Sequence, residues 1–135
     1  MDTKGVENYL KLKETYFGGK DPEIVELEGR LDSWSSQAKF EPVFELIESG
    51  KHNIAIDLSR VDYMSSSGLR QVLKAGNECR EHNRGDLVVV DPPKRVIEAL
   101  DLAGFIDIDG NGNVVRGDKP VHLFRSGFEV INKRR

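Results

Sequence analysis

The sequence predicts an α/β fold in which a mixed central β-sheet of about four to five strands is flanked by about four α-helices. Apolar runs at residues 54–58 and 87–90 are nearly continuous, which is typical of strands buried in the centre of such a sheet. Amphipathic segments of helical period alternate with the strand patterns. A length of 135 residues suits one domain, so we expect residues 1–135 to form a single unit.

The first elements predict a β-hairpin. Residues 9–16 alternate apolar and polar side chains, which is a strand pattern. Residues 17–22 contain two glycines and a proline and predict a turn. Residues 24–29 alternate again, so we expect the two strands to pair.

A helix and the first central strand are expected next. Several possible N-caps lie in residues 31–36, and apolar side chains then recur with a rough helical period up to Ile47. Pro42 indicates that the first turn is separate or bent, or that the main helix begins near Pro42. Residues 49–51 end this helix, and residues 52–58 predict a central strand.

The middle of the chain predicts two further helices around a second buried strand. Residues 69–81 place apolar side chains on one helical face and polar side chains largely on the other, so this helix should pack on the sheet. Residues 86–90 predict the strand. A helix over residues 96–103 is opened by two prolines and ended by Gly104.

The C-terminal part predicts one more strand region and a last helix. Residues 105–108 and 114–115 flank a turn-forming run, so this region is either one short strand with a loop or a hairpin. After Pro120, residues 121–131 predict an amphipathic helix, and the basic residues 133–135 suit its C-terminus. The predicted order is therefore strand–strand–helix–strand–helix–strand–helix–strand–helix.

Composition narrows the class of partner and compartment. The net charge is −3, with 20 basic and 23 acidic residues intermixed, so neither nucleic acid nor an anionic membrane is an expected partner. A single cysteine, Cys79, forms no intrachain disulfide and suits a reducing compartment. The N-terminal residues are polar, and no apolar run approaches the roughly 20 residues that span a bilayer. We therefore expect a soluble, cytoplasmic protein.

The sequence predicts no enzyme, no metal site and no cofactor. His52, His82 and His122 lie in different elements, and neither C-x-x-C nor H-E-x-x-H is present. Residues 64–68 lack the glycine that precedes the serine of a nucleophile elbow. Residues 109–113 lack the closing glutamate of a calcium loop and are interpreted as a plain turn. Glycine loops of the nucleotide-binding types are absent as well.

Ser65, Ser66 and Ser67 lie at the junction between the first central strand and the helix that follows it. Free backbone N–H groups and the positive end of a helix dipole meet at such a junction. One interpretation is that one serine caps the helix and the others are turn residues. The other is phosphorylation, which a helix N-terminus tolerates well. Ser67 precedes Gly68, so its hydroxyl is sterically accessible to a kinase.

The run IAIDLSRVDYMSSSGL at residues 54–69 resembles the core motif of STAS domains, in particular the bacterial anti-sigma factor antagonists. The family pattern is an apolar strand followed by D-L-x-x-V-x-[FY]-[ILM]-D-S-[ST]-G-[LI]. LEGRLD at residues 27–32 resembles the family's L-x-G-x-L-D, NRGDLVVV at residues 83–90 resembles its next strand, and VIEALDLAGF at residues 96–105 resembles its following helix and turn. Together these segments cover most of residues 8–132, the core that carries the motifs.

The resemblance implies a small α/β domain that acts by partner switching. Such a protein, when unphosphorylated, binds an anti-sigma factor that is itself a serine kinase of the histidine-kinase-like ATPase fold. Phosphorylation of the hydroxyl residue just before the motif glycine ends that binding, and a serine phosphatase reverses it. By the resemblance this residue is Ser67, and Ser66, which matches the first hydroxyl of the pair, is the second choice.

The resemblance also implies the partner-binding residues, which are Asp32, Ser65, Ser66, Ser67, Gly68, Leu69 and Arg70. Asp32 matches the family's acidic residue that lies near the phosphorylation site. Ser65 stands where the family pattern has an aspartate, and this extra serine keeps Ser66 as an alternative acceptor. The alternative function is that of an unphosphorylated STAS scaffold subunit in a transporter or signalling complex.

Overall fold

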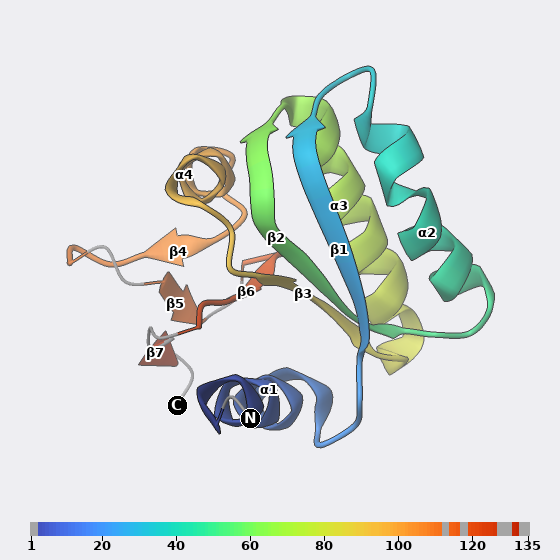
Figure 1. Ribbon diagram of the computed structural model, residues 1–135, viewed down its shortest axis with the longest axis vertical. Coiled ribbons are helices and arrows are strands. Elements are labelled where there is room, and N and C mark those ends of the chain that lie inside the picture. Colours follow the sequence, from blue (N-terminus) through green and yellow to red (C-terminus); the bar gives the residue numbers. More distant parts are fainter. Residues whose placement is uncertain (1–2, 112–113, 117–118, 127–130, 133–135) are drawn as a thin grey trace.

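The computed structural model describes residues 3–111, 114–116, 119–126 and 131–132. Its α-helices and strands alternate from residue 3 to residue 108, and further strands follow (Figure 1). The elements, in chain order, are α1 (Thr3–Phe17), β1 (Glu23–Leu31), α2 (Ser36–Glu48), β2 (Asn53–Met64), α3 (Ser66–Arg80), a short 3₁₀ turn (Glu81–Asn83), β3 (Asp86–Val90), α4 (Lys94–Leu102), β4 (Asp107–Ile108), β5 (Val114–Arg116), β6 (His122–Phe124) and β7 (Ile131–Asn132).

Two sheets organise the described residues. The main sheet has the strand order β1-β2-β3-β6, and each neighbouring pair in it is parallel. The smaller sheet has the order β4-β5-β7, with an antiparallel β4–β5 pair and a parallel β5–β7 pair. The predicted α/β class is confirmed, and the antiparallel pairing of the described residues is confined to the smaller sheet.

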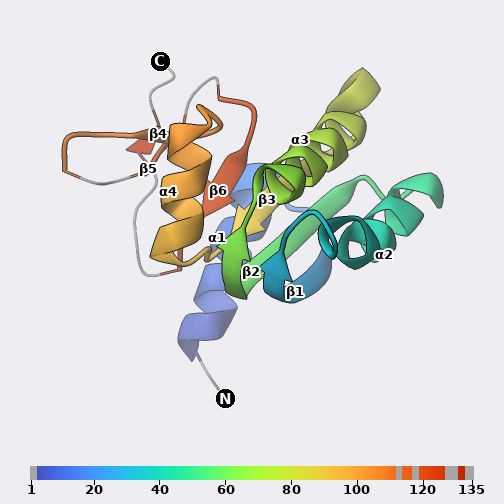
Figure 2. The ribbon, with the colours of Figure 1, turned by 90° about the horizontal axis from the view of Figure 1, so that it is seen from above.

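Helices cover both sides of the main sheet. Helices α2 and α3 lie side by side along one face, while α4 and the smaller sheet lie on the opposite side (Figures 1 and 2). Apolar side chains of α2, α3 and α4 join those of the strands in one large buried cluster. Its fully buried members of largest volume include Phe40, Leu31, Ile54, Ile56 and Leu58. The carboxyl ends of β1 and β2 are thereby held on a packed core.

The strand expected at residues 9–16 is wrong, because these residues belong to the helix α1. Leu12 and Tyr16 are four residues apart, so a helix brings them onto one face together with Phe17. That face packs in a second apolar cluster, on Ala55, Val88 and Phe124. The buried Tyr16 hydroxyl also donates to the carbonyl of Leu123 at 3.0 Å. Burial of this face overrides the alternating pattern, so the expected hairpin with β1 is absent.

The last predicted helix, over residues 121–131, is wrong where the structure describes it. Residues 122–124 form the strand β6, which pairs with β3 and occupies its outer edge. An unpaired edge would leave backbone N–H and C=O groups of β3 without partners. Residues 127–130 and the basic tail at residues 133–135 lie outside the described part of the chain.

Two smaller expectations were left open by the sequence, and the structure decides them. Helix α2 runs without interruption from Ser36 to Glu48 with Pro42 inside it, so the main helix neither begins at Pro42 nor has a separate first turn. Of the two alternatives for residues 105–115, the hairpin is present, formed by β4 and β5.

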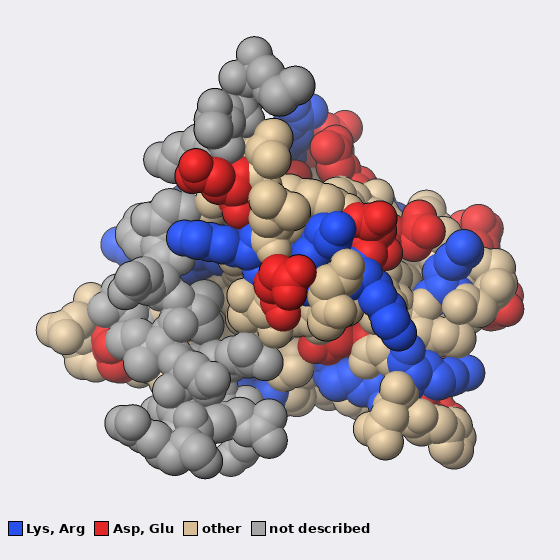
Figure 3. Space-filling model, turned by 90° about the horizontal axis from the view of Figure 1, so that it is seen from below, with Lys and Arg blue, Asp and Glu red and all other residues tan. Residues whose placement is uncertain are grey.

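Two observations concern the expectation that neither nucleic acid nor a membrane is a partner: the distribution of surface charge and the character of the helices. On the face seen from below, acidic and basic side chains are interspersed wherever residues are described (Figure 3). Within the described residues, no helix has both the length and the apolar character that a bilayer crossing requires.

Candidate functional site: the junction of β2 and α3

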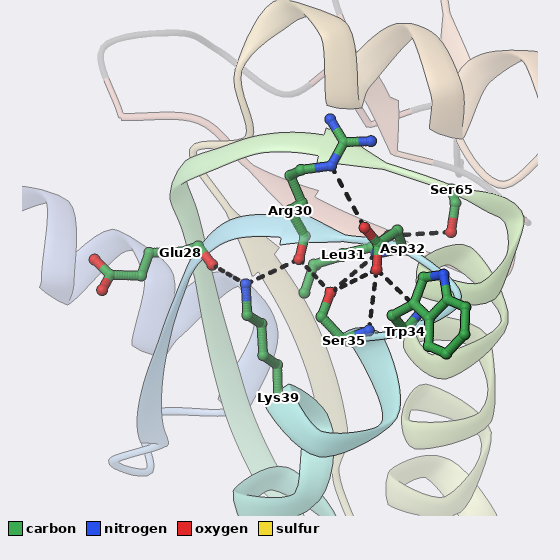
Figure 4. A network of polar contacts seen from close by, with 8 residues as sticks. All are labelled: Glu28, Arg30, Leu31, Asp32, Trp34, Ser35, Lys39 and Ser65. Atoms are coloured by element: carbon green, nitrogen blue, oxygen red, sulfur yellow. Dashed lines mark hydrogen bonds and ion pairs between the residues drawn. The ribbon is translucent and has the colours of Figure 1, made fainter.

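The three serines lie where β2 ends and α3 begins. Ser65 is the N-cap residue of α3, in an extended conformation, and its carbonyl accepts the N–H of Leu69 at 3.0 Å. Its hydroxyl does not cap the helix. Instead, both the hydroxyl and the amide of Ser65 donate to the carbonyl of Leu31, at 3.1 and 2.9 Å (Figure 4). Ser65 therefore joins the start of α3 to the end of β1.

Gly68 allows the first turn of α3 to lie against the end of β1. A Cβ atom at Gly68 would come within 2.9 Å of the Leu31 carbonyl oxygen and 2.9 Å of Met64 Cγ. A glycine is needed where backbone approaches this closely. The glycine of the serine motif is thus explained by packing between α3 and β1.

Asp32 organises the loop between β1 and α2. Its Oδ1 atom accepts the hydroxyl of Ser35 at 2.9 Å and the backbone N–H groups of Trp34 and Ser35, each at 3.0 Å (Figure 4). The hydrogen bond from the Ser35 hydroxyl, followed by the one from the Trp34 amide, holds the pKa of Asp32 below its usual range. A weaker contact joins its Oδ2 atom to Arg30 Nε at 3.4 Å.

Two basic side chains, Lys39 of α2 and Arg30 of β1, make contacts at the end of β1. The Lys39 ammonium donates to the carbonyls of Glu28 and Arg30, at 2.8 and 2.9 Å. Gly29, between these two residues, has a φ of +78°, a conformation that favours glycine. The Arg30 guanidinium lies over the ring of Tyr63 on β2, with its Cζ atom 4.2 Å from the ring centre. Lys39 therefore links α2 to the end of β1, the two elements that the Asp32 loop connects.

Ser67 and Arg70 lie on one face of α3, three residues apart. Arg70 Nη2 is 3.4 Å from Ser67 Oγ. The Ser67 side chain is half-buried, whereas Ser66 and Arg70 are exposed. The first turn of α3 contains no acidic residue. A negative charge added here would thus meet the helix N-terminus and a guanidinium, with no carboxylate in that turn.

Comparison with known proteins identifies the family. The profile of the STAS domain family matches residues 19–116, which is well over half of the chain. The chain belongs to the STAS domain family. It is also 31% identical, over 85 residues, to a putative anti-sigma factor antagonist, BtrV of Bordetella bronchiseptica, and the alignment covers 63% of this chain and 72% of that protein.

A solved structure resembles this STAS domain in part. It is the anti-sigma factor antagonist SpoIIAA in its unphosphorylated form, with 20% sequence identity and a TM-score of 0.49. The superposition covers 60% of this chain and 70% of the other. The resemblance to STAS domains and anti-sigma factor antagonists, noted on the sequence motifs, is confirmed by the family match and the BtrV relationship.

Most of the sequence-predicted site residues of this STAS domain gather at one end of the sheet. Asp32 follows β1, and Ser65 to Arg70 follow β2, which is the parallel neighbour of β1. Leu69 differs from the others because its half-buried side chain packs against the large core cluster. Its role in the STAS domain is therefore partly that of a core residue.

Sequence reasoning missed Trp34 as a surface feature. Its side chain is 93% exposed, although the Asp32 carboxylate fixes its backbone. Trp34 borders a groove of about 500 Å³ between α2 and α3, whose other lining residues include Phe44, Gln71 and Lys74. Tryptophan with so little burial contributes little to folding and is typical of binding surfaces. An isolated tryptophan in a polar loop was the available signal.

The remaining candidates for chemistry lie elsewhere. Burial raises the pKa of the Cys79 thiol to about 12, so this cysteine is a core residue and a poor nucleophile. His122 contacts Asp86 at 2.6 Å, and Asp86 also pairs with Arg80 at 3.0 Å. Asp86 is the first residue of β3, whereas the serines follow the last residue of the parallel strand β2. The cluster around Asp86 therefore lies at the opposite end of the strands from the serines. Among the described residues, no group of His, Cys, Asp and Glu is arranged to hold a metal ion.

Proposed function

We propose that this STAS domain is an anti-sigma factor antagonist that works by partner switching. With Ser67 unphosphorylated, it binds an anti-sigma factor that is also a serine kinase of the histidine-kinase-like ATPase fold. Phosphorylation of Ser67 by that kinase ends the binding, and a serine phosphatase restores it. The domain itself has no enzymatic activity. Because the kinase consumes ATP, we place this exchange in the cytoplasm.

The observation that carries the proposal is the position of the Ser67 hydroxyl. It lies in the first turn of α3, beside Arg70 and without an acidic neighbour in that turn. A phosphate carries about −1.5 to −2 charges at neutral pH. The helix N-terminus accommodates such a group, so phosphorylation here can change the surface while α3 stays folded.

The binding surface we propose consists of the residues at the junction and the loop beside it. They are Asp32, Ser65, Ser66, Ser67, Gly68, Leu69 and Arg70, to which the exposed Trp34 is added. The hydrogen bonds from Ser65 to Leu31 and from the Trp34 amide to Asp32 hold the two parts of this surface in a fixed relation. A preorganised surface binds with less loss of conformational entropy.

A small change in binding free energy on phosphorylation of Ser67 is enough to change greatly the fraction of the domain bound to its partner. A change of ~1.4 kcal/mol alters affinity tenfold. Added bulk and charge at the centre of an interface easily exceed this value, because a like-charge contact alone costs several kcal/mol. The switch therefore requires no change of fold in the STAS domain.

Phosphate transfer tests the proposal directly. The purified chain is incubated with ATP and the serine kinases of this fold from the source organism, and the products are mapped by mass spectrometry. We expect one phosphate per chain, located on Ser67, and none on the Ser67→Ala variant. The matched variant Ser66→Ala should be phosphorylated normally; loss of the phosphate in Ser66→Ala alone would move the acceptor to Ser66.

Affinity capture separates this function from that of a scaffold subunit. Immobilised wild-type chain should retain a histidine-kinase-like ATPase, and Ser67→Asp should retain less of it while the far-ultraviolet dichroism stays native. Retention of a membrane transporter subunit by both variants, with no phosphate on any serine, would instead support the scaffold function and contradict the switch.

A further inference from the structure

Arg70 is an exposed cation whose position relative to Ser67 is set by the helix. Residues three apart on a helix lie on the same face, and Arg70 Nη2 already lies 3.4 Å from Ser67 Oγ. At this length the contact to a neutral hydroxyl is weak. The geometry nevertheless places a guanidinium within reach of any group attached to that hydroxyl.

The other basic side chains of this region are engaged elsewhere. Arg30 contacts Asp32 and stacks on Tyr63. The Lys39 ammonium donates to two backbone carbonyls of β1. The Lys74 ammonium lies 5.0 Å from the ring centre of Phe44. Arg70 makes no ion pair within the part of the chain that the structure describes, and its described contact is the one to Ser67.

We propose that Arg70 binds the phosphate of phosphorylated Ser67. Phosphate oxygens extend beyond the position of Oγ, and the planar guanidinium can donate two parallel hydrogen bonds to them. Phosphorylation thus turns a weak contact between a guanidinium and a neutral hydroxyl into an ion pair between two charged groups. This inference deepens the proposed function and rests on it for its biological meaning.

The pair changes the binding surface in two ways at once. The phosphate adds negative charge at Ser67, and Arg70, which is free to meet a partner before phosphorylation, is drawn onto the phosphate. A partner that contacts both the Arg70 guanidinium and the Ser67 hydroxyl would lose both contacts on phosphorylation. Internal neutralisation also keeps the first turn of α3 helical, because the added charge has a partner within its own helix.

Phosphorus NMR of the phosphorylated chain tests the role of Arg70 without a kinase. Phosphoserine is installed at position 67 during synthesis by genetic code expansion, in the wild-type background and in the Arg70→Gln, Arg70→Lys and Lys74→Gln backgrounds. Lys74→Gln is the matched control, because it removes one exposed positive charge from the same helix, one turn further on. The phosphorus resonance of each protein is then followed through the titration of the phosphate near neutral pH.

We expect the titration midpoint of the phosphate to rise in Arg70→Gln relative to wild type, because the dianion loses its partner. The midpoint in Arg70→Lys should lie between the two, and that in Lys74→Gln should stay close to wild type. Equal midpoints in all four proteins, or an equal rise in Arg70→Gln and Lys74→Gln, would overturn the inference. A failure of the kinase to phosphorylate Ser67 would contradict the proposed function alone, because the phosphate in this experiment is installed without it.

Discussion

Both the amide and the hydroxyl of Ser65 donate to the carbonyl of Leu31, at 2.9 and 3.1 Å, so the end of β1 and the start of α3 form one hydrogen-bonded unit. Asp32 follows Leu31 directly and fixes the loop to α2, while Gly68 allows α3 to lie against Leu31. The candidate site is therefore a rigid corner of the fold, with the residues proposed to contact the partner arranged around it.

Replacing Gly68 with alanine should destabilise the STAS domain, although alanine is the better helix former by about 1 kcal/mol. The new Cβ atom would lie 2.9 Å from both the Leu31 carbonyl oxygen and Met64 Cγ. Crowding of a packed site costs about 1–3 kcal/mol, which urea unfolding measures.

Gly76→Ala on the same helix is the matched control for Gly68→Ala. Its Cβ atom would meet the end of a side chain, Arg80 Nη2 at 2.8 Å, whereas the Cβ atom at position 68 would meet the backbone carbonyl of Leu31. We expect a clearly smaller loss of stability in this control. Equal losses, or a more stable Gly68→Ala protein, would show that the α3–β1 contact is looser than described.

Leu12→Ala and Leu10→Ala distinguish the helix α1 from the strand that the sequence pattern predicted. In a strand the two leucines would share a face, and both substitutions would cost similar amounts. In α1, Leu12 is 5% exposed and Leu10 is 49% exposed. We expect the free energy of unfolding to fall by about 2–5 kcal/mol for Leu12→Ala and by much less for Leu10→Ala. Comparable losses of unfolding free energy in the two variants would contradict the helix and support the strand, and hence the hairpin, that the sequence pattern predicted.

The stability of the domain should depend on the charge of Asp32 at low pH. Hydrogen bonds hold the pKa of the folded-state carboxyl below its usual range, so the ionised form stabilises the native state. This contribution is fully present above the ordinary aspartate pKa of about 3.9 and is lost as the pH falls through the lower folded-state pKa.

The Asp32→Asn variant isolates this effect from other carboxyls, such as Asp21, whose pKa is also lowered. We expect it to be less stable than wild type at neutral pH, and the difference in free energy of unfolding to shrink as the pH falls below the usual aspartate range. A difference that is constant with pH would show that the charge of Asp32 is unimportant for stability.

Trp34→Ala should weaken binding of the kinase partner and leave stability nearly unchanged, because the indole is 93% exposed. Truncation of an aromatic anchor at an interface costs about 2 kcal/mol or more, which corresponds to well over tenfold in affinity. Leu102→Ala is the control, since Leu102 on α4 is 88% exposed but lies on the other side of the sheet. If both variants bind as wild type does, Trp34 lies outside the interface.

Much of the fold follows from local patterns, and the errors have a common cause. The strands β1, β2 and β3 and the helices α2, α3 and α4 were predicted near their observed positions, because their apolar periods match their burial. Residues 9–16 satisfy both the strand and the helix period. The helix is selected by the packing of Tyr16 and its neighbours against Ala55, Val88 and Phe124 of the main sheet. Similarly, residues 122–124 form a strand because β3 offers them an edge.

The candidate site was predictable in its position and less so in its construction. The serine junction was visible in the sequence pattern, and the family resemblance added Asp32; the structure shows that both follow neighbouring parallel strands, β2 and β1. The role of the Leu31 carbonyl could not be predicted, because a backbone acceptor leaves no trace in residue type. The diversion of the Ser65 hydroxyl from helix cap to β1, and the contact between Ser67 and Arg70, depend on side-chain orientation. Trp34 became informative only through its exposure.

The affinity of the serine kinase for the two phosphorylation states of this STAS domain tests the central claim most directly. Isothermal titration with unphosphorylated chain, with chain carrying phosphoserine at position 67, and with Ser67→Ala provides the comparison. We predict that the phosphorylated chain binds at least about tenfold more weakly than the other two, a difference of ~1.4 kcal/mol. Equal affinity of the kinase for the phosphorylated and unphosphorylated chains would contradict the account.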